Sequence, residues 1–155
     1  MISVTEAKKI IDQNVYPLKA TVLPLQEAAG LISAENIYAE IDIPAFPQSS
    51  MDGYAFSYSN WQKDKKLQIS REIAAGNNEI FTLNQNEAVR IFTGAPVPPG
   101  ADTVVMQEKV KLLNNELTIE DENLQSGSNV RPRGSEIKAA ALAMGKDSVL
   151  TPAAI

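Results

Sequence analysis

The segment 43–58 constrains the fold most strongly, because a stiff lead-in, a tight turn and an aromatic strand follow one another directly. Pro44 and Pro47 fix φ and favour extended geometry in the residues before them, so the lead-in cannot be helical. Asp52 lies in the polar turn that follows, and residues 54–58 alternate aromatic and small side chains as a half-buried strand does. The pattern predicts a carboxylate at a rigid corner, where its simplest role is to bond the backbone of its own turn.

The composition removes several classes of chemistry. The 155 residues include no Cys and no His, which excludes disulfides, thiolate nucleophiles and the commonest general base and transition-metal ligand. A bound metal is then expected to be a hard, oxygen-liking cation such as Mg²⁺. The net charge of −5 argues against nucleic-acid binding, and no apolar run reaches membrane-spanning length. We therefore expect a cytoplasmic globular protein without a nucleic-acid or membrane partner.

Both ends of the chain show helix signals. Ser3 and Glu6 match a capping box, and apolar residues follow at helical spacing. A short second helix is expected over residues 25–29, and residues 37–43 alternate apolar and polar side chains as a strand does. Pro152 stands at a helix start only three residues before the last residue, so we expect the chain to be part of a longer protein.

The middle of the chain predicts β-structure. The predicted strands cover residues 67–73, 88–92, 103–106 and, as a hairpin, 110–119. Asn114 and Asn115 are the turn of that hairpin, and a further turn is expected at residues 76–78.

Helix signals at the two ends and strands in the middle together predict an α+β fold with two lobes. Residues 1–44 and 138–155 are expected to form a mixed α/β lobe from both chain ends. Residues 45–137 are expected to form an inserted β-rich, barrel-like lobe.

Four stretches, covering almost the whole chain, resemble the N-terminal region of the MoeA/gephyrin-E family of molybdopterin molybdenumtransferases. They are residues 42–44 with 50–55, residues 87–91 with 93–96, residues 100–102 with 104–108, and residues 129–131 with Gly134. The resemblance implies an α/β lobe built from discontinuous segments and an inserted β-rich lobe, in agreement with the two lobes predicted from the patterning.

The resemblance also implies a step in molybdenum cofactor synthesis. The family takes adenylylated molybdopterin and molybdate as substrates, uses a divalent cation such as Mg²⁺, releases AMP and leaves molybdenum on the dithiolene. A homodimer is implied, with the active cleft between the inserted β-rich lobe of one subunit and the pterin-binding domain of the other. Molybdopterin adenylyltransferase is the implied protein partner.

Three catalytic residues are implied by the same resemblance. Asp52 matches the acidic position of the family's MDGYA motif and is expected to hold Mg²⁺ or to orient water. Thr93 matches the threonine of the TGAP motif; its hydroxyl can bond an oxyanion, or equally satisfy loop backbone. Glu136 falls where the family carries aspartate in a Gly-Glu-Asp-Ile sequence. This chain has Gly-Ser-Glu-Ile there, so the carboxylate is one methylene longer and lacks an acidic neighbour.

Arg131 and Arg133 lie in the densest basic cluster of the chain and are candidates to bind molybdate or phosphate, with a solvated surface turn as the alternative. No Gly-rich anion-binding loop before a helix appears in the sequence, so the chain is expected to supply half of a site and to be inactive alone. The alternative function is a non-catalytic scaffold or interaction module of a gephyrin-like relative, which the substituted Ser135 and Glu136 would suit.

Overall fold

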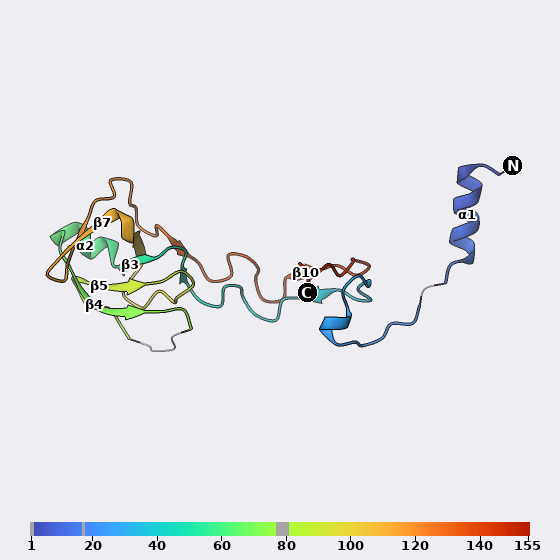
Figure 1. Ribbon diagram of the computed structural model, residues 1–155, viewed down its shortest axis with the longest axis horizontal. Coiled ribbons are helices and arrows are strands. Elements are labelled where there is room, and N and C mark those ends of the chain that lie inside the picture. Colours follow the sequence, from blue (N-terminus) through green and yellow to red (C-terminus); the bar gives the residue numbers. More distant parts are fainter. Residues whose placement is uncertain (1, 17, 77–80) are drawn as a thin grey trace. The chain divides into compact units, whose positions relative to one another are not determined.

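The structure, a computed structural model, describes residues 2–16, 18–76 and 81–155 (Figure 1). The chain divides into two compact units, of which one combines the two chain ends, up to residue 37 and from residue 144, and the other comprises residues 38–143. The lobe boundaries expected from the sequence stay a prediction. The content of few helices and many short strands is that of an α+β protein.

Helix α1 (Val4–Asn14) begins with the predicted capping box, which is confirmed. The Ser3 hydroxyl accepts a hydrogen bond from the Glu6 amide (3.2 Å), and the Glu6 carboxylate accepts one from the Ser3 amide (2.8 Å). No residue of α1 is buried.

The helix predicted over residues 25–29 is instead the single 3₁₀ turn η1 (Leu25–Glu27). Its bonds are of the i to i+3 kind, from the Ala28 amide to the Leu25 carbonyl (3.1 Å), and Gly30 then takes a left-handed φ of 81°. One such turn is the usual length of a 3₁₀ segment.

The strand predicted over residues 37–43 is also shorter than expected. Only β1 (Ile37–Tyr38) is regular, and it pairs with β10 (Leu142–Met144). Ala140, which bonds the Ala39 carbonyl, has a left-handed φ of 64°, and this conformation interrupts the regular pairing.

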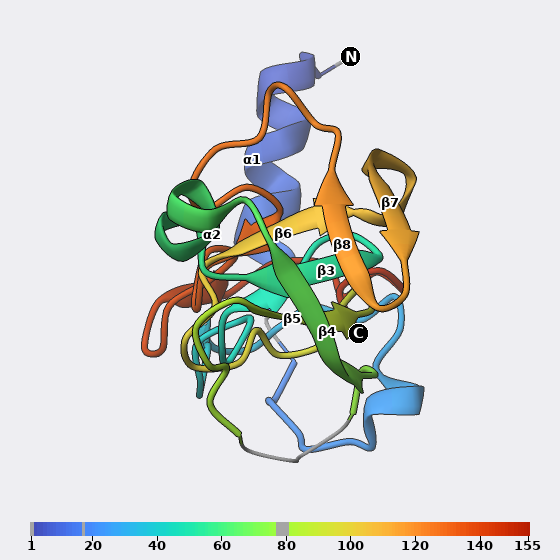
Figure 2. The same ribbon diagram turned by 90° about the vertical axis from the view of Figure 1, so that its left-hand side faces the viewer.

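A six-stranded sheet makes up most of the unit formed by residues 38–143 (Figure 2). In spatial order its strands are β6 (Thr103–Met106), β3 (Gly53–Phe56), β5 (Glu87–Ile91), β4 (Leu67–Ile73), β8 (Glu116–Ile119) and β7 (Val110–Leu113). Neighbouring strands are antiparallel except β4 and β5, which are parallel. The sheet is curled, and β6 and β7 are its edges, so the barrel-like feature predicted from the sequence is an open half-barrel.

Three shorter elements of this unit lie outside the six-stranded sheet and near the candidate site. Strands β2 (Gln48–Ser49) and β9 (Val130–Arg131) pair antiparallel, and the 3₁₀ turn η2 (Gln107–Lys109) directly follows β6.

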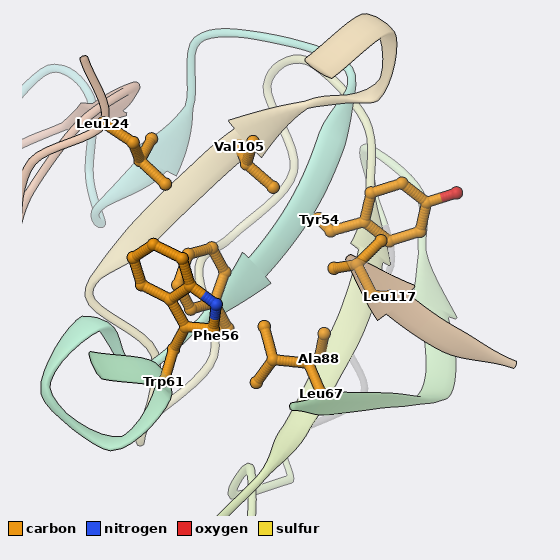
Figure 3. Close-up of a cluster of buried hydrophobic side chains, with 8 residues drawn as sticks. All are labelled: Tyr54, Phe56, Trp61, Leu67, Ala88, Val105, Leu117 and Leu124. Atoms are coloured by element: carbon orange, nitrogen blue, oxygen red, sulfur yellow. The ribbon is translucent and has the colours of Figure 1, made fainter. Parts of the chain in front are cut away.

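Strand β3 is buried on both faces. Tyr54 and Phe56 pack into one apolar cluster with Trp61 (Figure 3), whereas Ala55 belongs to a second cluster. Phe56 and Trp61 meet edge to face, with 5.8 Å between ring centroids. The strand predicted over residues 54–58 is present as far as Phe56, but the prediction that it is half-buried is wrong, because Ala55, between the two aromatic residues, faces apolar packing and not solvent.

The aromatic stretch ends in a helix that the sequence prediction missed. Helix α2 (Tyr58–Asp64) begins where the Asp102 carboxylate accepts a hydrogen bond from the Tyr58 amide (2.9 Å). Trp61 is its buried residue, and Lys65 ends it with a left-handed φ of 55°. Tyr58 and Trp61 have helical spacing, but the alternation of aromatic and small residues up to residue 58 predicts a strand.

The predicted hairpin is confirmed. β7 and β8 join at Asn114 and Asn115, whose φ values of 50° and 64° are both left-handed, as a type I′ turn requires. The turn predicted at residues 76–78 lies partly outside the described residues, and residues 151–154 form a turn where a helix start was predicted.

No helix in the described part of the chain is long and apolar enough to cross a membrane.

Candidate functional site

Asp52 lies at the corner between β2 and β3, and Thr93 from the loop after β5 holds its side chain. One carboxylate oxygen, Oδ1, accepts hydrogen bonds from both the Thr93 amide (2.8 Å) and the Thr93 hydroxyl (2.7 Å). The two residues are 41 positions apart, so the carboxylate does more than cap its own turn. The structure therefore brings two of the predicted site residues together.

Gly53 accounts for the tightness of this corner. A Cβ atom at residue 53 would lie 1.9 Å from the Val105 carbonyl oxygen, so only glycine lets β3 and β6 approach this closely. The register of the two strands, which aligns Gly53 with Met106, also brings η2 beside the corner. The Gln107 amide there donates to the Asp52 carbonyl (3.0 Å).

The loop that carries Thr93 is fastened to the same corner through Ser49, which is buried. The Ser49 carbonyl accepts a hydrogen bond from the Gly94 amide (2.8 Å), and the Ser49 amide donates to the Ala95 carbonyl (3.0 Å). These two backbone hydrogen bonds, directly after Thr93, therefore help to set the position of Thr93 relative to Asp52.

The direction of the hydroxyl bond follows from the chemistry of its two partners. An ionised carboxylate can only accept, so the Thr93 hydroxyl donates its single proton to Asp52. The hydroxyl then offers a ligand only a lone pair, whereas bonding an oxyanion, one of the two roles left open by the sequence, requires its proton. In this arrangement Thr93 orients Asp52.

Asp52 is ionised at neutral pH, and one of its oxygens is open. The hydrogen bond from the Thr93 amide, then that from its hydroxyl, and then the positive charge of Arg90 hold the pKa of Asp52 below its ordinary value of 3.8. The second oxygen, Oδ2, has no hydrogen-bond partner among the described residues. The carboxylate is thus fixed through one oxygen and available to a ligand through the other.

Asp52 and Thr93 line an open pocket of ≈ 290 Å³, which we call the acidic pocket. Its other lining residues are Met51, Met106, Gln107 and Glu108. Glu108 supplies a second carboxylate, which accepts a hydrogen bond from the Gln107 side-chain amide (3.0 Å). Sequence reasoning did not identify Glu108 as a site residue. The signal that finds it is the pairing of the start of β3 with the end of β6.

The other three predicted site residues belong to a separate arrangement. Arg131 and Glu136 pair with each other (Nη1–Oε1, 3.1 Å), and Arg133 pairs with Asp42 (Nε–Oδ2, 2.7 Å). None of the three lines the acidic pocket. Arg133 instead borders a wider pocket of ≈ 500 Å³ that several prolines line.

The fold and this corner define a class of protein, in which a curled mixed sheet presents an acidic turn beside an open pocket. The chain matches the family described as MoeA N-terminal region (domain I and II) over residues 2–155. The chain therefore belongs to this family.

Individual relatives agree with this assignment. The molybdopterin molybdenumtransferase of Haemophilus influenzae is 36% identical over 157 residues, which are 100% of this chain and 39% of that protein. A Nostoc protein of the same name is 36% identical over 165 residues, 93% of this chain and 38% of the relative. The crystal structure of a molybdopterin biosynthesis MoeA protein from Pyrococcus horikoshii matches with a TM-score of 0.83 at 29% identity, over 96% of this chain and 41% of that one. The chain thus spans about two fifths of the length of these relatives.

Proposed function

We propose that this chain provides one side of the active site of a molybdopterin molybdenumtransferase. The reaction transfers molybdenum from molybdate to adenylylated molybdopterin and releases AMP. The observation that carries the proposal is the ionised Asp52 carboxylate, which is fixed through one oxygen and open to the acidic pocket through the other. Family membership and the names of the relatives support it, and those names do not favour the alternative of a non-catalytic scaffold.

Mg²⁺ is the proposed cofactor, and the donor groups of the acidic pocket fit it. Asp52 Oδ2 and the Glu108 carboxylate are hard oxygen donors. A magnesium site commonly uses one or two carboxylates and completes its shell with water and substrate phosphate oxygens. Within the described residues no group of three or more acidic side chains gathers, so these two carboxylates are the ligands that we propose this chain contributes to such a site. When bound, Mg²⁺ supplies charge neutralisation at the phosphate oxygens.

The pairings in the structure support the roles that we propose for Asp52 and Thr93. Asp52 holds the cation or orients the attacking water, and Thr93 keeps Asp52 in place. The catalytic role of Glu136 stays a proposal that rests on the family motif. The substrate-binding role of Arg131 and Arg133 stays a proposal that rests on their charge in the basic cluster. An anion that bound Arg131 would have to displace Glu136, its present partner at 3.1 Å.

We also propose the wider arrangement that the family resemblance implies. The protein would be a cytoplasmic homodimer with a lobe of residues 1–44 and 138–155 and an inserted lobe of residues 45–137, and it would receive its substrate from molybdopterin adenylyltransferase. The relatives are longer than this chain, and their additional length is where a phosphate-binding loop would lie. The chain alone is therefore expected to release no AMP above background.

The test uses a chimera in which this chain replaces the matching part of the Haemophilus influenzae relative. AMP release is measured with adenylylated molybdopterin, molybdate and Mg²⁺. Asp52→Asn is expected to cut turnover by ~10²-fold or more, the low end for a positioned acid–base group, while thermal unfolding changes little because asparagine keeps the shape of the turn.

Asp42→Asn is the matched control, because both oxygens of that aspartate are already bonded within the chain. It should leave AMP release close to that of the parent chimera. The proposal fails if Asp52→Asn melts early while its folded fraction turns over normally, since the carboxylate would then only stabilise the turn.

A further inference from the structure

Arg90 lies on β5, opposite Tyr54 of β3, and is not one of the residues that line the acidic pocket. The guanidinium carbon lies 5.2 Å from the centroid of the Tyr54 ring and 4.9 Å from that of the Phe92 ring. Its Nη1 donates to the Gly53 carbonyl (3.1 Å), and its Nη2 donates to the Gln107 side-chain oxygen. Two rings and two acceptors therefore restrict a side chain that no function assigned so far requires.

Gln107 passes this restraint on to the backbone of Asp52 and to the carboxylate of Glu108. Its backbone amide donates to the Asp52 carbonyl (3.0 Å), and its side-chain nitrogen donates to Glu108 (3.0 Å). A guanidinium can only donate and a carboxylate can only accept, so the side-chain amide has a single orientation, with its oxygen toward Arg90 and its nitrogen toward Glu108. The opposite orientation would place donors against donors and acceptors against acceptors.

We propose that Arg90 is a positioning residue of the acidic pocket, which fixes the Asp52 corner through the Gly53 carbonyl and the Glu108 carboxylate through Gln107. The carboxylates that Arg90 positions would bind a divalent cation, so this role rests on the proposed function. It requires the planar fork of the guanidinium, because one side chain must bond acceptors on β3 and on η2 at the same time. A lysine has the charge but lacks the fork.

The test compares the 155-residue chain with its Arg90→Lys variant. The readouts are Mn²⁺ affinity, followed by electron paramagnetic resonance of the free ion, and solvent exchange of the Gln107 side-chain amide, followed by NMR. Arg90→Lys keeps the net charge, and we expect it to weaken Mn²⁺ binding about tenfold, the low end for partners that orient a metal-binding carboxylate. The Gln107 side-chain protons should also exchange faster.

A second variant distinguishes a positioning role of Arg90 from an effect of its positive charge. A positive charge near a cation site opposes binding, so Arg90→Met should tighten Mn²⁺ binding if Arg90 acts through its charge and weaken it if Arg90 acts by positioning. Lys111→Met is the control for one lost positive charge, because Lys111 pairs with Glu120 on the β7–β8 hairpin. It should leave both readouts unchanged.

The proposal is overturned if Arg90→Lys retains wild-type Mn²⁺ affinity and Gln107 exchange, or if Arg90→Met binds Mn²⁺ more tightly. A wild-type chain that binds no Mn²⁺ would remove the cation from the proposed function. The Gln107 exchange would still decide whether Arg90 positions the pocket: faster exchange in Arg90→Lys supports that role, and unchanged exchange rejects it.

Discussion

Two aspartates of this protein each accept one backbone amide and one side-chain donor, but those donors are distributed differently over their oxygens. At Asp42 the Ala139 amide bonds Oδ1 (2.9 Å) and the Arg133 guanidinium bonds Oδ2 (2.7 Å). At Asp52 the amide and the hydroxyl both belong to Thr93 and share Oδ1, at 2.8 and 2.7 Å. Both oxygens of Asp42 are therefore used by the fold, whereas one oxygen of Asp52 is left for a ligand.

A lowered pKa does not by itself identify the functional carboxylate here. The Ala139 amide, followed by the hydrogen bond and charge of Arg133 and then the charge of Lys138, holds the pKa of Asp42 below 3.8, as the bonds from Thr93 and the charge of Arg90 do for Asp52. The bonded partner of Asp42 is a cation, so its charge is already neutralised. The bonded partner of Asp52 is a neutral residue, which leaves its negative charge for the acidic pocket.

The largest difference in stability is expected between alanine variants of two glycines, Gly53 beside Asp52 and Gly134 beside Arg133, the partner of Asp42. Gly53→Ala places a Cβ 1.9 Å from the Val105 carbonyl oxygen, so we expect a loss of ~3 kcal/mol or more in the free energy of unfolding. Gly134→Ala, at a φ of 66°, meets only the flexible Lys138 side chain and should cost roughly 1–2 kcal/mol, the penalty of the left-handed conformation. Urea unfolding measures both; equal losses would show that the Asp52 corner is not the tighter one.

A smaller effect is expected when the hydroxyl that orients Asp52 is removed. Thr93→Val keeps the amide bond and the shape but loses the 2.7 Å hydroxyl bond. We expect AMP release by the chimera to fall about tenfold, as is common when a partner of a metal-binding carboxylate is removed. Thr93→Ser retains the hydroxyl and should stay near the parent rate. Equal rates for the valine and serine variants would contradict the orienting role.

The smallest expected effect is on the pH dependence of stability. Both carboxylates have folded-state pKa values below 3.8, so each stabilises the folded protein above that pH, and the contribution is lost as the pH falls through the folded-state value. Wild-type stability should therefore decrease between about pH 4 and pH 2. The stability of Asp42→Asn, measured by urea unfolding, should converge with the wild type in this range. A difference that stays constant down to about pH 2 would show that Asp42 contributes no ionised-state stability.

Much of the local structure is predictable from the sequence because it depends on neighbouring residues. The capping box, the strands over residues 67–73 and 103–106 and the Asn114-Asn115 turn all follow from local patterns, and the structure confirms them. Helix α2 escapes prediction because the acceptor at its first amide is Asp102, 44 residues away. No pattern within the segment reveals a partner at that distance.

The residues of the candidate site likewise include some that the sequence predicts and some that it does not. The proline-rich lead-in and Gly53 predict a rigid corner at Asp52, and only the family motif points to Thr93. The roles of Glu108 and Arg90 depend on the register of β6 and β5 against β3, which the sequence does not specify. Glu108 and Arg90 therefore become part of the site through strand pairing, and no local sequence pattern marks them.

A paramagnetic titration of the isotope-labelled chain with Mn²⁺, in which the side-chain carboxylate carbons are observed by NMR, tests directly whether the free oxygen of Asp52 binds a cation. We expect small additions of Mn²⁺ to broaden the carboxylate signals of Asp52 and Glu108 and to leave that of Asp42 sharp. This expectation is contradicted if the Asp42 signal broadens as much as that of Asp52, or if Asp52 stays sharp while other carboxylates respond.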